Sequence, residues 1–250
     1  MHWIDDGLIL SAKKYGENSV ILQALTREHG RHAGLVRGGT GKRLRGILQS
    51  GNLVGLRWQG RLSEQLGNYA VEANNSAGAL LFDQPLKLAA ASAALSLLEK
   101  VLPERETHTS LFEASLLLIK NLSGGIEHWG PLFVRWELGL LTEMGYGLDL
   151  SECASTGIRE DLVYVSPKSG RAVCAAAGFP YHDRLLGLPE FLVPETGRSV
   201  DRMMPQQILD GLHLTGYFIH KNLLPHYGNE ALPARERFVF SLEQRFQTTE

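Results

Sequence analysis

The chain changes its hydrophobic period once, near residue 83, and this change constrains the fold more than any other feature. Before that point, apolar and β-branched residues form short runs between glycine-rich turns, a pattern typical of β-strands. Beyond it, apolar residues recur every three or four positions, as on the buried face of an α-helix. The sequence therefore predicts an α+β protein with a β domain at residues 1–82 and a helical domain at residues 83–250.

The first domain contains five candidate strands, at residues 4–11, 19–25, 32–37, 52–59 and 62–72. A glycine-rich loop, residues 38–46, separates the third candidate strand from the fourth. Its four glycines favour a mobile backbone, and Lys42, Arg43 and Arg45 favour a negatively charged partner. Five short strands with a long basic loop predict a small barrel such as an OB-fold, although an SH3-like barrel fits the number of strands as well.

Five apolar stripes predict the helices of the second domain as a bundle with buried faces. The first helix begins near Pro85, the third ends at Gly145-Tyr146-Gly147, and the fourth covers residues 205–224. The stripes consist of Leu88, Ala91, Leu95, Leu98 and Leu102; Leu111, Ser115, Leu118 and Leu122; Phe133, Trp136, Leu140 and Met144; Ile208, Leu212, Ile219 and Leu223; and Phe238, Leu242 and Phe246.

Residues 151–177 interrupt the helical pattern between the third and fourth helices. Within this insert, two short apolar runs at residues 162–165 and 171–174 flank a turn and predict a β-hairpin. Both cysteines of the chain, Cys153 and Cys174, lie here. Two cysteines are too few for a disulfide framework, so they indicate thiols in a reducing compartment or the remains of a metal site.

The composition is that of an ordinary folded protein, with 44% hydrophobic and 21% charged residues. A length of 250 residues allows one large domain or two small ones with a substantial core. The most apolar stretch, residues 86–98, is shorter than a membrane span and contains Lys87. Asp5 and Asp6 stand where a signal peptide carries positive charge. We therefore expect no membrane segment and a cytoplasmic location.

Charge is distributed unevenly along the chain. Residues 1–61 contain ten basic and four acidic residues, whereas the remainder contains 15 basic and 23 acidic ones, giving charges of +6 and −8. This asymmetry is typical of a polyanion-binding face joined to a body with another role, although uneven surface charge also arises by chance. The residues that we assign to nucleic-acid contacts are Arg27, Arg31, Arg37, Lys42, Arg43, Arg45, Arg57, Trp58 and Arg61.

These contacts are expected to be electrostatic and indifferent to base sequence. If about six phosphates are neutralised, the affinity falls by roughly three decades between about 50 and 200 mM salt. Trp58 lies beside Arg57 and leaves two alternatives open. An exposed tryptophan on a barrel face stacks on a base, whereas a buried one belongs to the core.

The sequence offers no candidate set of catalytic residues, and we predict no cofactor. Residues 39–42 resemble the end of a phosphate-binding P-loop. However, Val36 replaces the first glycine of that motif, and Arg43 replaces its Ser or Thr. Neither a nucleophile elbow nor a His-Glu-x-x-His metal helix occurs. The acidic pairs lie at the ends of predicted elements, where a solvated surface explains them.

These residues resemble the RecO family of bacterial recombination mediators, and the resemblance covers essentially the whole chain, although its last fifty residues are generic. In the first domain it rests on Tyr15-Gly16-Glu17-Asn18-Ser19, Leu25-Thr26-Arg27-Glu28-His29-Gly30, Val36-Arg37-Gly38-Gly39, Leu48-Gln49-Ser50-Gly51 and Trp58-Gln59-Gly60-Arg61. In the second domain it rests on Phe133-Val134-Arg135-Trp136-Glu137-Leu138, Leu141 and Met144-Gly145-Tyr146.

The resemblance implies an OB-fold followed by a helical domain that holds a small zinc-ribbon-like insert. It also implies a protein that is not an enzyme, binds single- and double-stranded DNA, anneals complementary strands and binds the acidic tail of single-stranded DNA-binding protein. Together with RecR, such a protein loads RecA, so its location is the cytoplasm in association with the nucleoid.

The insert departs from the family pattern. Members with zinc use two Cys-x-x-Cys pairs, but Cys153 and Cys174 are each only the first cysteine of a pair, with Thr156 and Ala177 at the second positions. Two thiolates cannot complete the four-ligand shell of a structural zinc. We therefore expect no zinc, and a hairpin held together by packing.

Arg135 and Leu138 are the residues that we assign to the partner's tail. On a helix, Arg135 lies beside Leu138 and Gly139. An arginine next to an apolar patch suits a peptide with hydrophobic residues and a free carboxylate at its end; the alternative is a solvated arginine paired with a neighbouring acid. A second hypothesis for the whole chain is an RNA-binding or translation-associated OB-fold protein, because a basic barrel alone does not distinguish the nucleic acids.

Overall fold

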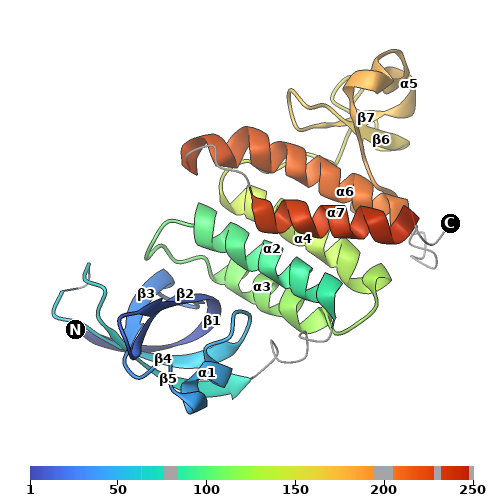
Figure 1. The fold of residues 1–250 in the computed structure, drawn as a ribbon. Coiled ribbons are helices and arrows are strands. Elements are labelled where there is room, and N and C mark those ends of the chain that lie inside the picture. Colours follow the sequence, from blue (N-terminus) through green and yellow to red (C-terminus); the bar gives the residue numbers. More distant parts are fainter. Residues whose placement is uncertain (63, 76–83, 194–204, 228–231, 248–250) are drawn as a thin grey trace. The chain divides into compact units, whose positions relative to one another are not determined.

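A computed structural model of the chain describes residues 1–62, 64–75, 84–193, 205–227 and 232–247 (Figure 1). The backbone divides into two compact units. The first comprises Met1–Ser123 and Leu232–Phe238, and the second comprises Gly124–Ala231 and Val239–Glu250. The predicted α+β class is confirmed, whereas the predicted domain boundary at residues 82 and 83 lies outside the described residues and stays a prediction.

The first unit contains a closed five-stranded barrel with the strand order β1-β2-β3-β5-β4 (Figure 1). Its strands are β1 (His2–Tyr15), β2 (Ser19–Thr26), β3 (Gly30–Val36), β4 (Leu53–Gln59) and β5 (Asn68–Asn75). Neighbouring strands pair antiparallel, except for β3 and β5, which pair in parallel. A five-stranded barrel of this kind is an OB-fold, so that prediction is confirmed.

Alternation along the strands fills the barrel with apolar side chains. Residues from every strand, among them Ile9, Leu22, Val36, Leu56 and Tyr69, form one buried cluster. A short helix, α1 (Lys42–Ile47), packs Leu44 and Ile47 against this cluster. The predicted loop over residues 38–46 is confirmed for residues 38–41, which form a turn, and is wrong from Lys42 onward, because packing against the barrel stabilises a helix there in spite of its low local propensity.

Strand β1 contains a β-bulge at Leu10. Ile9 pairs with Ala24 and Ser11 pairs with Gln23, which leaves Leu10 as the extra residue. A bulge shifts the alternation of side chains by one residue. Before the bulge, Ile9 faces the barrel interior; after it, Lys14 lies on the same face as its partner Val20. Lys13 consequently points away from the barrel.

Two predicted strand boundaries need correction. β1 and β2 extend to a tight turn at residues 16–18. β1 therefore includes Lys13 to Tyr15, whereas the first candidate strand was expected to end at residue 11. The fifth strand was expected at residues 62–72 but begins at Asn68. Leu62 and Leu66 are exposed, and Gly67 has a φ of +61°, so this stretch forms a turn ahead of the strand.

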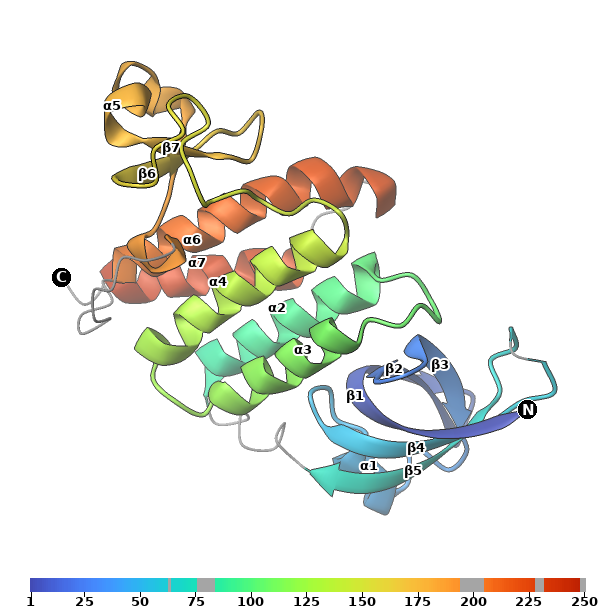
Figure 2. The same ribbon diagram turned by 180° about the vertical axis from the view of Figure 1, so that it is seen from behind.

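Helices α2 (Pro85–Val101) and α3 (Thr109–Asn121) also belong to the first unit and lie side by side (Figures 1 and 2). The predicted stripes are buried, except that Leu88 is 39% exposed near the start of α2. The loop after α2 packs closely on the start of β3. There Gly30 has a φ of +65°, and a Cβ at this position would collide with the backbone of Glu106.

The second unit is built on the packed pair α4 (Ile126–Glu143) and α6 (Pro205–Phe218). α4 ends before Gly145, which has a φ of +84°, as predicted. The predicted fourth helix changes type: a π-helix covers Ile219–Leu223, and a 3-10 helix covers Leu224–Tyr227.

Helix α7 (Pro233–Gln247) belongs to the first unit up to Phe238 and to the second from Val239 onward. Phe238 and Leu242 of its predicted stripe are buried, whereas Phe246 is half-buried. Among the helices of the described residues, none is long and apolar enough to cross a membrane.

The insert in the second unit contains the predicted hairpin, β6 (Leu162–Val165) and β7 (Ala172–Cys174). It extends further than residue 177, because β8 (Leu186–Gly187) pairs with β6 and makes a sheet of order β7-β6-β8. Helix α5 (Ala175–Gly178) and a 3-10 helix (Phe179–Arg184) connect β7 to β8, and another 3-10 helix (Glu190–Leu192) follows. The ammonium of Lys221 donates to the carbonyl of Pro167 over 2.6 Å and joins the hairpin turn to the π-helix.

Candidate nucleic-acid interface

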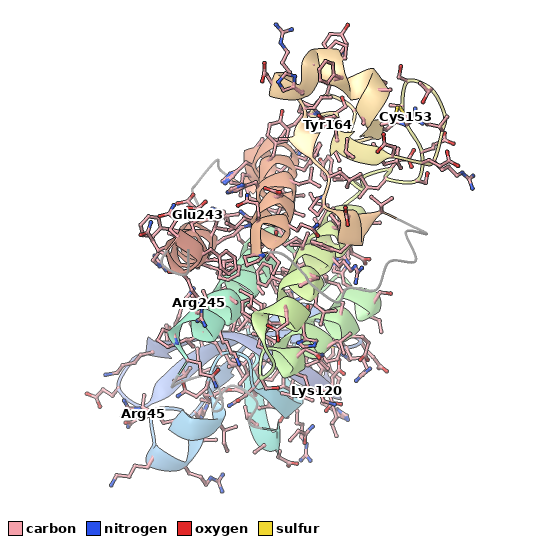
Figure 3. All side chains as sticks on the ribbon, turned by 90° about the vertical axis from the view of Figure 1, so that its right-hand side faces the viewer. Arg45, Lys120, Cys153, Tyr164, Glu243 and Arg245 are labelled. Atoms are coloured by element: carbon pink, nitrogen blue, oxygen red, sulfur yellow. The ribbon has the colours of Figure 1, made fainter. Side chains whose placement is uncertain are left out.

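A pocket of about 440 Å³ lies on the barrel where the β1–β2 hairpin meets the segment around α1. Two lining residues, Lys14 and Arg45, carry positive charge, and no lining residue is acidic. Figure 3 shows Arg45 on α1. The complete lining consists of Ala12, Lys14, Val20, Gly39, Thr40, Arg45, Leu48, Gln49 and Ser50. The pocket therefore attracts anions, and its hydroxyl and amide groups can donate hydrogen bonds to them.

Local structure fixes both basic side chains. The bulge in β1 places Lys14 on the pocket side of the hairpin. Arg45 lies in the last turn of α1, where its backbone N–H donates to the carbonyl of Gly41 over 3.0 Å. The carbonyl of Arg45 in turn accepts a hydrogen bond of 2.6 Å from the side-chain amide of Gln49. The main chain thus fixes the positions from which both side chains extend.

The charged groups beside the pocket are unpaired. Lys42 and Arg43, like Lys14 and Arg45, are exposed, and none of the four forms an ion pair within the part of the chain that the structure describes. Free cations on a surface are the groups that bind phosphates and release counterions. Of the predicted contact residues, Arg45 lines the pocket, and Lys42 and Arg43 lie on the same helix. The structure adds Lys14, which was not among the predicted residues.

Two other predicted contact residues are engaged within the first unit. Arg27 forms an ion pair with Glu113, and its guanidinium lies 4.9 Å from the centre of the Phe112 ring. The Nε of Arg31 donates to the carbonyl of Leu102 over 2.7 Å. These arginines join the barrel to α3 and to the end of α2, so they do not line the pocket.

The remaining predicted arginines are exposed but scattered. The Nε of Arg37 donates to Oδ1 of Asn68 over 3.2 Å. Arg57 lies on the outer face of β4, opposite Ile4 and Ala70. Arg61 follows β4 and is exposed. None of the three lines the pocket.

The structure corrects the assignment of Trp58 to nucleic-acid contacts. Trp58 is 1% exposed, and its indole N–H donates to the carbonyl of Leu66 over 3.1 Å. It follows Val54 and Leu56 at a spacing of two, on the inward face of β4. Of the two alternatives for this residue, the core position is the one observed, and no face of its ring is available for stacking on a base.

An aromatic cluster surrounds Trp58 inside the barrel. The Trp3 ring stacks on His29 with a centroid distance of 4.1 Å, and Nδ1 of His29 lies 2.9 Å from the carboxylate of Asp5. His32 is buried, and desolvation together with the nearby charge of Arg105 lowers its pKa from 6.5 to about 4. This histidine is therefore a neutral part of the core at physiological pH.

Arg135 of α4 contacts Phe191, and not the neighbouring acid of the alternative prediction. Its Nη2 donates to the carbonyl of Phe191 over 2.6 Å, and its guanidinium lies 5.7 Å from the centre of the Phe191 ring. Leu138, one turn further along, is half-buried, and Gly139 is exposed. Phe191 was not predicted to belong to this site. It lies 56 residues after Arg135, so no local sequence pattern connects the two residues.

The residues of the insert do not fit a structural zinc. Within the described ranges, no group of three or more His, Cys, Asp or Glu side chains converges on one point. Cys153 and Cys174 are both buried free thiols. The hydroxyl of Thr156 lies 3.7 Å from Sγ of Cys174, where a zinc-binding insert needs another thiolate.

A closed five-stranded barrel with an anion-attracting pocket, followed by packed helices, defines a protein of the OB-fold class. Sequence comparison then identifies the family. The profile described as "Recombination protein O N terminal" matches residues 1–75, and "Recombination protein O C terminal" matches residues 83–230. The chain belongs to the RecO family, and its role lies in DNA repair and recombination.

Curated relatives agree over the full length. The chain is 48% identical over 241 residues to the DNA repair protein RecO of Rhodospirillum centenum, which covers 96% of this chain and 94% of the relative. It is 46% identical over 252 residues to the DNA repair protein RecO of Methylocella silvestris, covering all of both chains. For the corresponding protein of Rhizobium rhizogenes, the identity is 42% over 239 residues, covering 96% and 90%.

Proposed function

We propose that this protein is a non-catalytic recombination mediator that binds single- and double-stranded DNA at the barrel and anneals complementary strands. One observation carries this proposal: exposed cations that form no ion pair with any residue the structure describes lie in and next to a pocket that has no acidic lining residue. Lys14 and Arg45 stand inside it, and Lys42 and Arg43 stand beside them on α1. Such a group neutralises phosphates without contacting base edges.

This chemistry suits annealing. Two DNA strands repel each other through their phosphates, and a cationic surface that holds both strands lowers this repulsion. Because the contacts go to phosphates, the base edges stay free to pair. The mechanism requires that one protein molecule binds two strands at once.

We further propose that Arg135, with Leu138, binds the C-terminal tail of single-stranded DNA-binding protein. A guanidinium has five N–H donors. The hydrogen bond to the Phe191 carbonyl uses one of them, and the others can reach the tail's terminal carboxylate. Half-buried Leu138 offers an apolar contact to the hydrophobic residues that precede this carboxylate. RecR and RecA complete the proposed set of partners, because the mediator acts with RecR to load RecA.

The test is an annealing assay with complementary oligonucleotides coated with single-stranded DNA-binding protein, whose tail is either intact or deleted, at low and high salt. We expect acceleration that depends on the tail and decreases with salt. The Lys14→Ala/Arg45→Ala variant should anneal more slowly, whereas Lys13→Ala should match the wild type, because Lys13 pairs with Glu99 outside the pocket.

Three outcomes would contradict parts of the proposal. Absence of annealing on bare strands at low salt would remove the annealing function, and tighter binding to RNA than to DNA of equal length would favour an RNA-binding role. Annealing that does not depend on the tail would leave the barrel interface intact and remove the site at Arg135.

A further inference from the structure

The two cysteines of the insert meet at one point of the fold. Cys153 begins a tight turn in which its carbonyl accepts from the N–H of Gly157 over 2.8 Å and its N–H donates to the carbonyl of Ile158 over 2.7 Å. Cys174 is the last residue of β7. The backbone N–H of Cys174 donates directly to Sγ of Cys153 over 3.3 Å. The sulfur of Cys153 therefore contacts the main chain of Cys174, although 21 residues separate the two cysteines.

Thr156 lies beside the cysteine pair. Its hydroxyl is 3.7 Å from Sγ of Cys174, and Thr156 also contributes to the lowered pKa of the Cys153 thiol. The turn that begins at Cys153 therefore brings a polar side chain to the pair. Figure 3 shows Cys153 within the insert.

The surroundings of Cys153 suit a thiolate better than a packed thiol. Burial raises the pKa of this thiol, but the Thr156 hydroxyl and the N–H groups of Cys174, Ser155 and Thr156 outweigh it and lower the pKa to about 6. A structural cysteine in an apolar core has no such donors and is inert, whereas a thiolate held by several donors is a nucleophile.

A short exposed turn adjoins the buried cysteine pair. Cys153 is 1% exposed, but the residues that follow it in the turn, Ala154 to Gly157, are all exposed. The N–H of Ala154 donates to the carbonyl of Ala172 over 2.8 Å and holds the start of the turn on β7, so the opening that the proposal requires is confined to residues 155–157. The pair is thus sealed from water on average and accessible to a small oxidant during local opening.

We propose that Cys153 and Cys174 form a modification site, at which a peroxide converts the two thiols into an intramolecular disulfide. The Cys153 thiolate attacks one peroxide oxygen and the O–O bond breaks. For hydrogen peroxide, the products are a sulfenic acid at Cys153 and hydroxide, which takes up the proton that the Cys153 thiol released on ionisation and becomes water. The Cys174 sulfur then attacks the sulfenic sulfur. The S–S bond forms, the S–O bond breaks, and the released hydroxide takes the Cys174 proton to give a second water.

The peroxide receives two electrons from the pair, and no metal takes part in the step. The product joins the turn at residues 153–158 to the end of β7. Such a cross-link restricts the unfolded chain between the two cysteines and therefore stabilises the insert. Oxidation should accordingly raise the resistance of the insert to proteolysis.

The experiment is a peptide map of the full-length protein by mass spectrometry, before and after treatment with hydrogen peroxide at neutral pH, together with a count of free thiols under denaturing conditions. We expect the loss of both thiols, a mass decrease of two hydrogen atoms, and a linked peptide pair containing Cys153 and Cys174. Reduction with a dithiol should restore both thiols. Thiols that survive peroxide, or a disulfide that links two chains, would overturn the proposal.

Variants define the roles of the two cysteines. In Cys174→Ser, the reaction should stop at the sulfenic acid, which dimedone traps at Cys153. In Cys153→Ser, Cys174 should react several-fold more slowly, because it lacks the donor set. Equal dimedone labelling of both single variants would contradict the assigned order of attack. If either variant fails to fold, the map of the unmodified protein still decides whether the disulfide forms.

Discussion

The hydroxyl of Tyr69 lies 3.0 Å from Nδ1 of His32 inside the barrel, where both side chains are buried. The same desolvation that lowers the pKa of His32 raises the pKa of Tyr69, with Asp5 adding to the rise. Both groups are therefore neutral at physiological pH, and together they form a polar contact within an aromatic core. Protonation of His32 introduces a charge into this core.

The free energy of unfolding should decrease as the pH falls from about 6.5 to about 4. In this window the unfolded chain binds a proton at His32 and the folded chain does not, so acid favours unfolding. The pKa difference corresponds to a loss of up to about 3 kcal/mol. Urea unfolding at several pH values measures the slope, which should be shallower in His32→Gln. Equal slopes in the two proteins would show that His32 titrates normally in the folded state.

Replacement of Lys14 by alanine should reduce the salt dependence of binding to single-stranded DNA. The slope of log affinity against log salt should become shallower by about 0.7, the contribution of one phosphate contact on a single strand. Lys13→Ala removes the same charge from the neighbouring residue but outside the pocket, and serves as the matched control. Fluorescence titration at several salt concentrations gives both slopes, and a similar change in both variants would argue for nonspecific attraction.

Arg135→Ala should weaken binding of a peptide that corresponds to the partner's tail by about 1.5–3 kcal/mol, because a charge-assisted hydrogen bond to a carboxylate is lost. Arg184→Ala, an exposed arginine of the insert, is the control and should bind as the wild type does. Isothermal titration calorimetry measures both affinities. An Arg135→Ala protein that binds the peptide with wild-type affinity would remove Arg135 from the proposed site.

Thr215→Val should destabilise the second unit by about 1–3 kcal/mol. The hydroxyl of Thr215 donates to the carboxylate of Glu137, and both residues are fully buried. Valine preserves the shape of the side chain but leaves a buried carboxylate with one donor fewer. Thr142→Val is the comparison, since the hydroxyl of Thr142 is on an exposed position of α4 and donates to the Leu138 carbonyl over 2.9 Å. Its cost should stay below about 0.5 kcal/mol in chemical unfolding.

Local patterns predicted the elements of this fold because each pattern reports a buried face. The strands alternate and the helices repeat every three or four residues, so the barrel and the principal helices were found. Helix α1 was not predicted, because the four glycines of residues 38–46 outweigh its short apolar pattern. Only contact with the barrel core explains why Leu44 and Ile47 are apolar. β8 was not predicted, because a strand of two residues is too short to show alternation of apolar and polar residues.

The site was only partly predictable, because the sequence shows charges but not their partners. Arg27 and Arg31 look like Lys42 and Arg43 in sequence, yet their partners Glu113 and Leu102 lie 86 and 71 residues away. The burial of Trp58 was predictable, because Trp58 follows Leu56 at the spacing of two that places both residues on the same face of a strand. The neighbouring Arg57 favoured the other interpretation, a contact with DNA. The contact between Cys153 and Cys174 likewise depends on how the insert folds, because 21 residues separate the two cysteines.

The bulge at Leu10 decides which of two adjacent lysines meets DNA in the proposed interface. If Leu10 paired with Gln23 instead of bulging, strict alternation along β1 would place Lys13 opposite Val20, on the pocket side, and Lys14 on the opposite face. Composition, net charge and the pair of lysines would all be unchanged. In this hairpin the pairing of one leucine, and not the number of basic residues, therefore determines which charge the pocket contains.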